Sequence, residues 1–473
     1  MSLQPDLATT AQSDGLSAAE IASAVQGRKT SALSVTEAAL ARIAKHDSVL
    51  NSFTDVTAER ARARARSVDA AIAAGKNAGP LAGVPFAVKN LFDVQGLPTR
   101  AGSKINRDLK PSPRDATLIE RMEAAGAVMV GALNMGEYAY DFTGENVHDG
   151  PSRNPHDVTR MTGGSSGGSG GAVGAALVPL ALGSDTNGSI RVPSSFCGIF
   201  GLKPTYGRLS RARSFPFVFS FDHLGPFARN VGDLALAYDA MQGPDAEDAA
   251  CTTRPAEPVT PLLTQDIGAL RVAIAGGYFQ KNVFPEAVEA VARVARALGT
   301  TRTVEIPEAA RARAAAYVIT TSEGASLHLD RLRRRPNDFD PAVRDRLIAG
   351  AMIPAPLIDR AQKFRRWYRD RMMELFKEVD VIIAPATPCV APKLGQTTFV
   401  LDGVELPVRA NIGIHTQPIS FIGLPVVAVP VPLEPMPIGV QIIAAPWREG
   451  IALRVAYALE RAGAVSAPRP RGL

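Results

Sequence analysis

Apolar and polar positions along the chain fall into two repeating patterns. Apolar residues at helical spacing, several of them preceded by a Ser/Thr cap, predict helices. The predicted helices cover residues 17–27, a segment that starts at Ser34, and residues 58–74, 115–126, 231–241, 286–298, 309–335, 341–351, 358–377 and 451–462. Short runs of small and β-branched residues predict buried strands over residues 86–88, 127–133, 270–275, 381–385, 425–430 and 439–444. Helices that alternate with buried strands indicate an α/β fold.

The domain organisation follows from where the polar stretches lie. The first three predicted helices precede the first strand and form a helical layer over residues 16–75. Further along, residues 242–264 are rich in Pro, Asp, Ala and Thr, which we interpret as a surface excursion, and no stretch has the length and polarity of a domain linker. We therefore expect a flexible N-terminus over residues 1–15 and one large α/β domain over residues 16–473.

Composition narrows the class of protein. With 473 residues, of which 46% are apolar, the chain can bury a large core. The net charge of +6 is spread out, and the basic run at residues 331–335 lacks the interleaved aromatics of a nucleic-acid site. Three cysteines without CxxC or Cys/His spacing predict neither disulfides nor a metal site. We expect a cytoplasmic protein without a signal peptide that binds neither nucleic acid nor membrane.

The stretch over residues 161–205 is the most unusual part of the chain. Residues 163–171 are all Gly or Ser, an apolar run follows over 172–182, and a polar turn follows over 183–189. Glycine loses more backbone freedom on folding than any other residue, so this density indicates close approach of the backbone to a ligand. A flexible linker would lack the apolar run. Serines in these two polar segments are therefore candidate reactive groups.

One hypothesis pairs such a serine with a histidine base. Residues 163–167 match the G-x-S-x-G elbow of Ser-His-Asp hydrolases, although residues 154–162, just before it, are polar and predict no strand. The chain has six histidines: His46, His148, His156, His223, His328 and His415. An esterase of the α/β-hydrolase type therefore remains an alternative.

The other hypothesis uses a lysine base. Lys89 follows the predicted strand over residues 86–88 and precedes Leu91. Burial in such a setting disfavours the charged ammonium, lowers the lysine pKa and makes the neutral amine available as a base. A lysine whose ammonium reaches the surface is the alternative.

At these residues the chain resembles the amidase signature family. The stretches that carry the resemblance are GVPFAVKN at 83–90, NMGEY at 134–138, residues 144–154, GGSSGG at 163–168, GSDTNGSIR at 183–191, CG at 197–198, GLKPT at 201–205, residues 380–388, GLP at 423–425 and GVQ at 439–441. They extend over residues 15–465, with the family's spacing. The resemblance implies an amide hydrolase that needs no cofactor or metal, built on a mixed central sheet covered by helices on both sides.

The resemblance also implies a role for each residue of a Ser-Ser-Lys triad. Ser189 would be the nucleophile that becomes acylated, Ser165 the bridging serine after a cis peptide bond, and Lys89 the base. An oxyanion hole would be formed by the backbone N–H groups of Thr186, Asn187, Gly188 and Ser189. Two residues depart from the family pattern. Asn187 replaces a usual glycine, for which we expect a tolerated positive φ and a narrower pocket, and Asn90 replaces a common Asp.

Within the family, the chain is most similar to the 1-carboxybiuret hydrolase subgroup. This similarity implies a small, polar, anionic substrate, release of ammonia, and a small helical partner polypeptide, in a homodimer or hetero-oligomer. Candidate substrate-binding residues are Arg191, Tyr138 and His415, with a structural role for Arg191 or His415 as the alternative. The glutamine-hydrolysing catalytic component of an aminoacyl-tRNA amidotransferase and a non-catalytic scaffold of the same fold are the competing interpretations.

Overall fold

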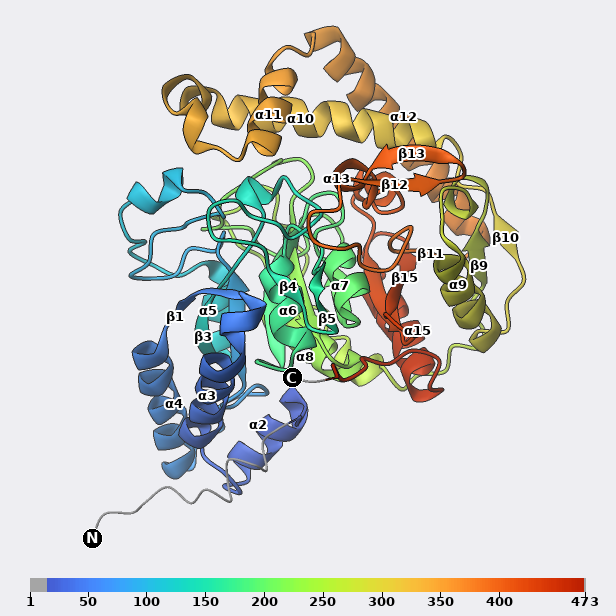
Figure 1. Ribbon diagram of the computed structural model, residues 1–473. Helices are drawn as coiled ribbons and strands as arrows, with labels where there is room; N and C mark the ends of the chain where they lie inside the picture. The colour runs from blue at the N-terminus through green and yellow to red at the C-terminus, as the bar shows by residue number, and fades with distance from the viewer. Residues whose placement is uncertain (1–14, 472–473) are drawn as a thin grey trace.

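The computed structural model describes residues 15–471, so the predicted flexible segment lies almost wholly outside the described residues. Its centre is one sheet of eleven strands (Figure 1). From edge to edge these are β1 (Phe53–Val56), β3 (Val128–Leu133), β2 (Pro85–Lys89), β6 (Leu180–Asp185), β8 (His223–Ala228), β7 (Phe200–Lys203), β14 (Val426–Val431), β15 (Ile438–Ala444), β11 (Val381–Pro385), β9 (Val272–Ala275) and β10 (Thr303–Val304). The sheet is mixed: β3, β2 and β6 run parallel, as do β11, β9 and β10, and the strands between are antiparallel.

Helices surround this sheet in groups (Figure 1). The larger ones are α2 (Ala18–Gln26), α3 (Ala32–Leu50), α4 (Ala58–Ala73), α5 (Thr117–Ala124), α6 (Gly167–Gly174), α7 (Arg191–Cys197), α8 (Val231–Met241), α9 (Pro285–Ala297), α10 (Ala309–Arg334), α11 (Pro341–Ala351), α12 (Ala355–Glu378) and α15 (Glu449–Arg461). Helices α3 and α4 lie at the end of the sheet that holds β1, and α2 contacts α8. Helices α10, α11 and α12 pack together across the top of the molecule. The fold is therefore the α/β architecture with a mixed central sheet that we expected.

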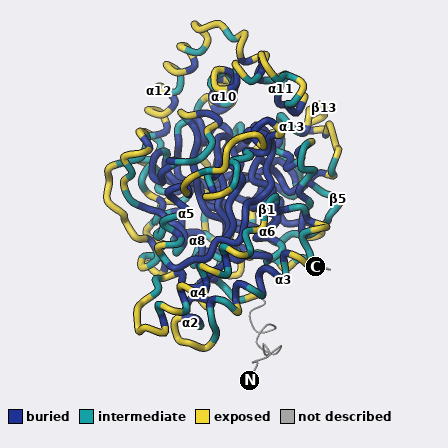
Figure 2. The backbone as a smooth tube through the Cα atoms, turned by 90° about the vertical axis from the view of Figure 1, so that its left-hand side faces the viewer, coloured by how far each residue is buried: buried dark blue, intermediate teal, exposed yellow. Residues whose placement is uncertain are grey.

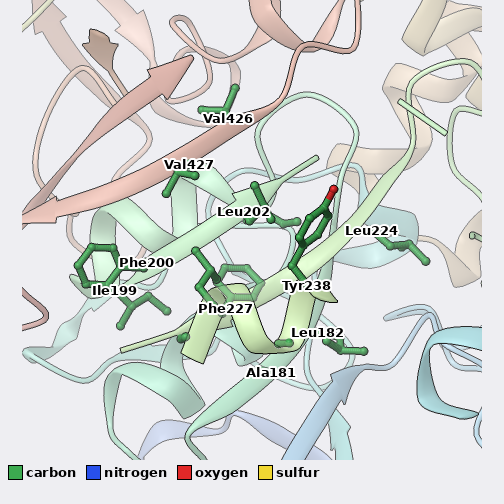
Figure 3. Close-up of a cluster of buried hydrophobic side chains, with 14 of the residues drawn as sticks. Ala181, Leu182, Ile199, Phe200, Leu202, Leu224, Phe227, Tyr238, Val426 and Val427 are labelled. Atoms are coloured by element: carbon green, nitrogen blue, oxygen red, sulfur yellow. The ribbon is translucent and has the colours of Figure 1, made fainter. Parts of the chain in front are cut away.

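The central strands are buried along their whole length, because helices cover them. Every residue of β2, β6, β7, β8, β14 and β15 is buried. Figure 3 shows part of this core, where Phe200 and Leu202 of β7 lie among Phe227 of β8 and Val427 of β14. Exposed backbone is concentrated in the outer helices and loops (Figure 2). The core therefore provides a rigid base for residues at the strand ends.

Most predicted elements are present, with small shifts at their ends. The capping box at Ser17 and the helix over 231–241 are confirmed. The helix start at Ser34 is wrong, because α3 begins at Ala32. Ser31 is its cap, with an extended backbone and a hydroxyl that accepts from the Ser34 N–H at 3.0 Å.

The expectation that residues 154–162 contain no strand is also wrong. Residues Asp157–Met161 form β5, which pairs with β4 (Arg153–Asn154) in a separate two-stranded sheet. This hairpin is largely polar because it lies outside the central sheet, and only one face of such a pair needs to be apolar. A strand therefore does precede Gly163-Gly164-Ser165, so the argument from its absence against a nucleophile elbow does not hold.

Candidate active site

The glycine- and serine-rich stretch folds into a helix, a strand and a second helix around one point. Ser165 and Ser166 lie just before α6, which leads to β6. Strand β6 ends at Asp185, residues 186–190 form a turn, and α7 begins at Arg191. Since β2 lies beside β6 in the sheet, this topology brings Lys89, at the end of β2, to the same place.

Lys89 is fully buried and surrounded by serine hydroxyls. Its Nζ lies 2.6 Å from Ser165 Oγ, 3.0 Å from Ser166 Oγ and 2.9 Å from Ser184 Oγ. Burial lowers the pKa of Lys89 to about 7, against the weaker opposing effect of nearby carboxylates, first Asp222. At neutral pH a substantial fraction of this lysine is therefore uncharged, and its hydroxyl partners can both accept and donate protons.

Ser189 lies in the turn after β6 and is 2% exposed. Within residues 15–471, the backbone N–H groups of residues 186–189 donate no hydrogen bond to a protein group. Other groups of the turn hold it in place. Asp185 Oδ2 accepts from the Ile190 N–H at 3.2 Å, and Thr186 Oγ1 donates to Asp222 Oδ1 at 2.6 Å. The turn thus presents several unused donors beside a serine hydroxyl.

Glycine is required immediately before Ser165 and immediately before Ser189. The Gly164–Ser165 peptide bond is cis, as the family resemblance implies. A Cβ at Gly164 would lie 2.4 Å from Asp141 Oδ2. Gly188 has φ +150°, and a Cβ there would lie 2.3 Å from Thr416 Oγ1. Asn187 is not among the residues with positive φ, so the conformation that we expected for it is wrong: the strain of the turn is taken by Gly188.

Two cavities reach this cluster. The inner cavity, of about 20 Å³, is lined by Ser189, Asn187, Asp141, Arg346 and Arg409, among others. An outer cavity of about 310 Å³ is lined by Ser184 and by residues of the loop over 211–219. Ala139 and Phe217 line both cavities. The larger cavity therefore does not touch Ser189, and the smaller one, with room for one water-sized group, does.

The three candidate substrate-binding residues from the sequence do not line the inner cavity. Arg191 is fully buried, and its guanidinium donates to Asp185 at 2.9 Å from both Nε and Nη2. Its remaining N–H groups donate to Thr416 O, Gln441 Oε1 and Ser420 Oγ. No N–H is left for a substrate carboxylate, which favours the structural alternative for Arg191.

Tyr138 and His415 are likewise packed away from Ser189. The Tyr138 hydroxyl donates to Asn106 Oδ1 at 3.1 Å, and its ring lies 4.0 Å from the His328 ring, centroid to centroid. His415 is buried against Phe279, with Nε2 3.4 Å from Lys281 O. Burial lowers the His415 pKa to about 4. Both side chains therefore contact other protein groups and do not line the inner cavity.

No histidine of the described chain forms a hydrogen bond with Ser189 or with the three serines that contact Lys89. His148 contacts Glu137, His156 contacts Cys197 O, and His223 contacts Asp185 O and Phe221 O through Nδ1. A Ser-His-Asp arrangement is therefore absent at this site within residues 15–471.

Sequence reasoning missed four residues that the structure brings to the site: Ser184, Asp222, Arg346 and Arg409. Ser184 lies in the family motif and could have been found there, but Arg346 and Arg409 come from distant segments with no local pattern. Arg346 lies on α11 with its guanidinium 3.8 Å from the Tyr140 ring centroid. Arg409 Nη1 lies 3.1 Å from Asp141 Oδ1. Both arginines line the inner cavity with Ser189.

Comparison with known proteins defines the class first. The family model described as Amidase matches residues 34–453. The chain therefore belongs to the amidase family, and it is an enzyme that hydrolyses amide C–N bonds. None of the described helices is long and apolar enough to cross a membrane.

Individual relatives narrow the similarity. The chain is 53% identical to AtzE, a 1-carboxybiuret hydrolase component of Pseudomonas sp. (strain ADP), over 94% of this chain and 98% of that protein. It is 38% identical to a component of the glutamyl-tRNA(Gln) amidotransferase of Azotobacter vinelandii, over 94% of this chain and 97% of that protein.

Solved structures agree. One match has a TM-score of 0.95 and 53% identity. It is a chain from the structure of a vestigial protein complex that reveals the evolutionary origins of an s-triazine catabolic enzyme. That match covers 96% of this chain and all of the other. A bacterial aryl acylamidase matches with a TM-score of 0.88 and 26% identity, over 96% and 97% of the chains.

Proposed function

We propose that this amidase works through a Ser-Ser-Lys triad in which Ser189 is the nucleophile, Ser165 the proton relay and Lys89 the base. The observation that carries the proposal is the 2.6 Å contact between Lys89 Nζ and Ser165 Oγ in a fully buried setting. A lysine can act as a base at neutral pH only when its pKa is lowered, and burial does this here.

The steps follow from the donor and acceptor character of these groups. The neutral amine of Lys89 takes the proton of Ser165, which takes the proton of Ser189 as the Ser189 Oγ attacks the amide carbon. The proton then returns along the same path to the leaving nitrogen, the C–N bond breaks and the amine departs as ammonia. Water, activated by the same relay, releases the acyl group from Ser189.

The backbone N–H groups of residues 186–189 would hold the oxyanion of both tetrahedral intermediates. They support this role because no described protein group accepts from them. Donors that are fixed before reaction are worth about 2.7–4 kcal/mol each in the transition state. The Thr186–Asp222 and Ile190–Asp185 contacts hold this turn in place.

The substrate that we propose is 1-carboxybiuret or a closely related small, anionic, urea-type amide. Its support is the 53% identity to the 1-carboxybiuret hydrolase component AtzE, together with the two arginines at the inner cavity. Arg346 is in none of the ion pairs formed within residues 15–471. Its contacts there are Ala342 O, Tyr140 O and the Tyr140 ring. A guanidinium without a carboxylate partner beside Ser189 suits a substrate carboxylate.

The inner cavity must widen for such a substrate, since it now holds about 20 Å³. Three of its lining residues, Tyr317, Thr320 and Arg346, belong to α10 and α11, which pack against each other. We infer that these helices, or the Phe217 side chain between the two cavities, move when substrate enters.

The test is ammonia release from 1-carboxybiuret, biuret, glutamine, malonamate and a simple aryl amide, with wild type and Ser189→Ala. We expect 1-carboxybiuret to have the highest kcat/KM, and Ser189→Ala to be folded and without measurable turnover. Glutamine as the preferred substrate would instead support the amidotransferase-type function. Turnover by Ser189→Ala close to wild type would reject Ser189 as the nucleophile.

We also propose a cytoplasmic, oligomeric enzyme with a small partner polypeptide. Its support is the chain of a protein complex that matches with a TM-score of 0.95, and three free cysteines, which suit a reducing compartment. Light scattering tests this on two preparations: the chain purified alone, and the chain purified from its own cells together with whatever binds it. A monomer in both preparations would contradict it.

A further inference from the structure

Asn187 lies in the wall of the inner cavity. It lies two residues before Ser189 and is 6% exposed. Its Nδ2 donates to Thr320 Oγ1, on α10, at 2.9 Å. With Nδ2 bonded to Thr320, Oδ1 lies on the opposite side of the amide group.

The Oδ1 atom of Asn187 is buried and has no hydrogen-bond donor among the described residues. Leaving a buried carbonyl oxygen unpaired costs about 1–3 kcal/mol, so the free energy favours a donor supplied by a ligand. Two other buried atoms at this cavity also lack hydrogen bonds, Tyr140 Oη and Arg409 Nη1. Arg409 Nη1, however, is in an ion pair with Asp141, and a tyrosine hydroxyl can donate as well as accept. Asn187 Oδ1 is the one of the three that can only accept.

We propose that Asn187 selects substrates with an N–H group next to the reacting carbonyl, as in ureas and biurets, by accepting that N–H at Oδ1. This inference rests on the proposed function and deepens it. An alkyl amide carries a CH₂ group at the same position, which would leave Oδ1 buried and unpaired in the complex. Sites built to hydrogen-bond a substrate group discriminate strongly against an analogue that lacks it, for this reason.

Biuret and malonamide are a matched pair for testing this, because they differ only in NH against CH₂ between the two carbonyls. The quantity to measure is the ratio of kcat/KM for biuret to kcat/KM for malonamide, in wild type and in Asn187→Ala. We expect the ratio to fall about 10- to 100-fold in Asn187→Ala, the range of one hydrogen bond to a buried acceptor. Damage to the oxyanion turn would affect both substrates and cancel in the ratio.

Two further variants separate selection from general disturbance. Thr320→Val removes the anchor of Nδ2, so we expect a fall in the same ratio that is smaller than in Asn187→Ala. Asn411→Ala is the matched control, since Asn411 is a buried asparagine whose Oδ1 and Nδ2 both have protein partners. Its ratio should equal that of wild type.

An unchanged ratio in Asn187→Ala would overturn the inference. If biuret or malonamide turns over too slowly, the ratio of their dissociation constants for Ser189→Ala and for the Ser189→Ala/Asn187→Ala double variant replaces it, with the same expectation. Failure of 1-carboxybiuret as a substrate would reject the proposed substrate but leave this ratio, and hence the role of Asn187, to be decided separately.

Discussion

Lys89 and Lys203 are both fully buried lysines at the ends of central strands, and they differ in what surrounds the ammonium. Burial lowers the pKa of each to about 7. Lys89 meets three serine hydroxyls, whereas Lys203 Nζ donates to two backbone carbonyls, Pro204 O and Leu424 O. Carbonyl oxygens accept hydrogen bonds but cannot give up a proton, so Lys203 has no group from which to take one.

This difference shows that a lowered pKa alone does not identify a base. Lys203 joins the end of β7 to Leu424, two residues before β14, so its contacts hold two strands together. Lys89 contacts groups that can exchange protons with it. The same contrast separates two arginines: all five N–H groups of Arg191 are used by the protein, while Arg346 has no carboxylate partner among the described ion pairs.

The largest expected effect comes from removing each lysine in turn. Lys89→Met should lower kcat/KM by about 10³-fold or more, because the relay loses its base, whose contribution alone is about 10²–10⁴-fold. Lys203→Met should keep kcat/KM per folded molecule within about tenfold and lower the free energy of unfolding by about 1–3 kcal/mol, since two buried carbonyls lose their donor. Equal losses of activity in the two variants would break the distinction.

Arg191→Met should act on stability. The variant leaves Asp185 as a buried carboxylate without its partner, which typically costs about 3–5 kcal/mol. Denaturant unfolding of the variant beside wild type measures this. If the variant is as stable as wild type and only its KM for anionic substrates rises, Arg191 binds substrate after all.

Arg346→Met should act on substrate binding and leave the relay intact. We expect KM for 1-carboxybiuret to rise about 10-fold, as for the loss of one charge-assisted hydrogen bond, and KM for neutral malonamide to stay nearly unchanged. Arg346→Lys should recover part of the loss, because it keeps the charge. A fall in kcat for both substrates with no change in KM would contradict this role.

For the histidines the account sets an upper limit, since none of them should be the base. Replacing any one of the six by glutamine should lower kcat/KM by less than about a hundredfold, the low end for loss of a general base. The buried His328 and His415 variants need a folding control, since burial lowers the pKa of each to about 3 and about 4 and both are packed against aromatic rings. One histidine variant as inactive as Ser189→Ala would restore the Ser-His-Asp alternative.

Much of the fold could be predicted from local pattern, because buried strands such as β11 are continuous apolar runs and amphipathic helices such as α9 have apolar residues at helical spacing. Strands β1, β7 and β8 were missed. Their hydrophobic pattern is short or broken by Gly and Pro, and only pairing within the sheet makes them strands.

The candidate site divides in the same way. Lys89, Ser165 and Ser189 lie in local motifs, so the sequence indicates them, and their roles remain predictions. Whether Arg191 is structural or binds substrate depends on the acceptors that it meets at Thr416, Ser420 and Gln441. These residues lie more than 220 positions away in the sequence. No local pattern could decide between its two roles.

The central claim is that neutral Lys89 is the base, and the pH dependence of kcat/KM tests it most directly. Activity should fall as the pH drops through about 7, because the lysine then takes up a proton and can no longer accept one from Ser165. This fall on the acid side of the pH profile, its acid limb, reports the ionisation of the lysine and the serines together. In Lys89→Arg, whose guanidinium stays protonated, we expect almost no activity at any pH between about 5 and 9. A Lys89→Arg variant that keeps most of the activity and the same acid limb would contradict the account.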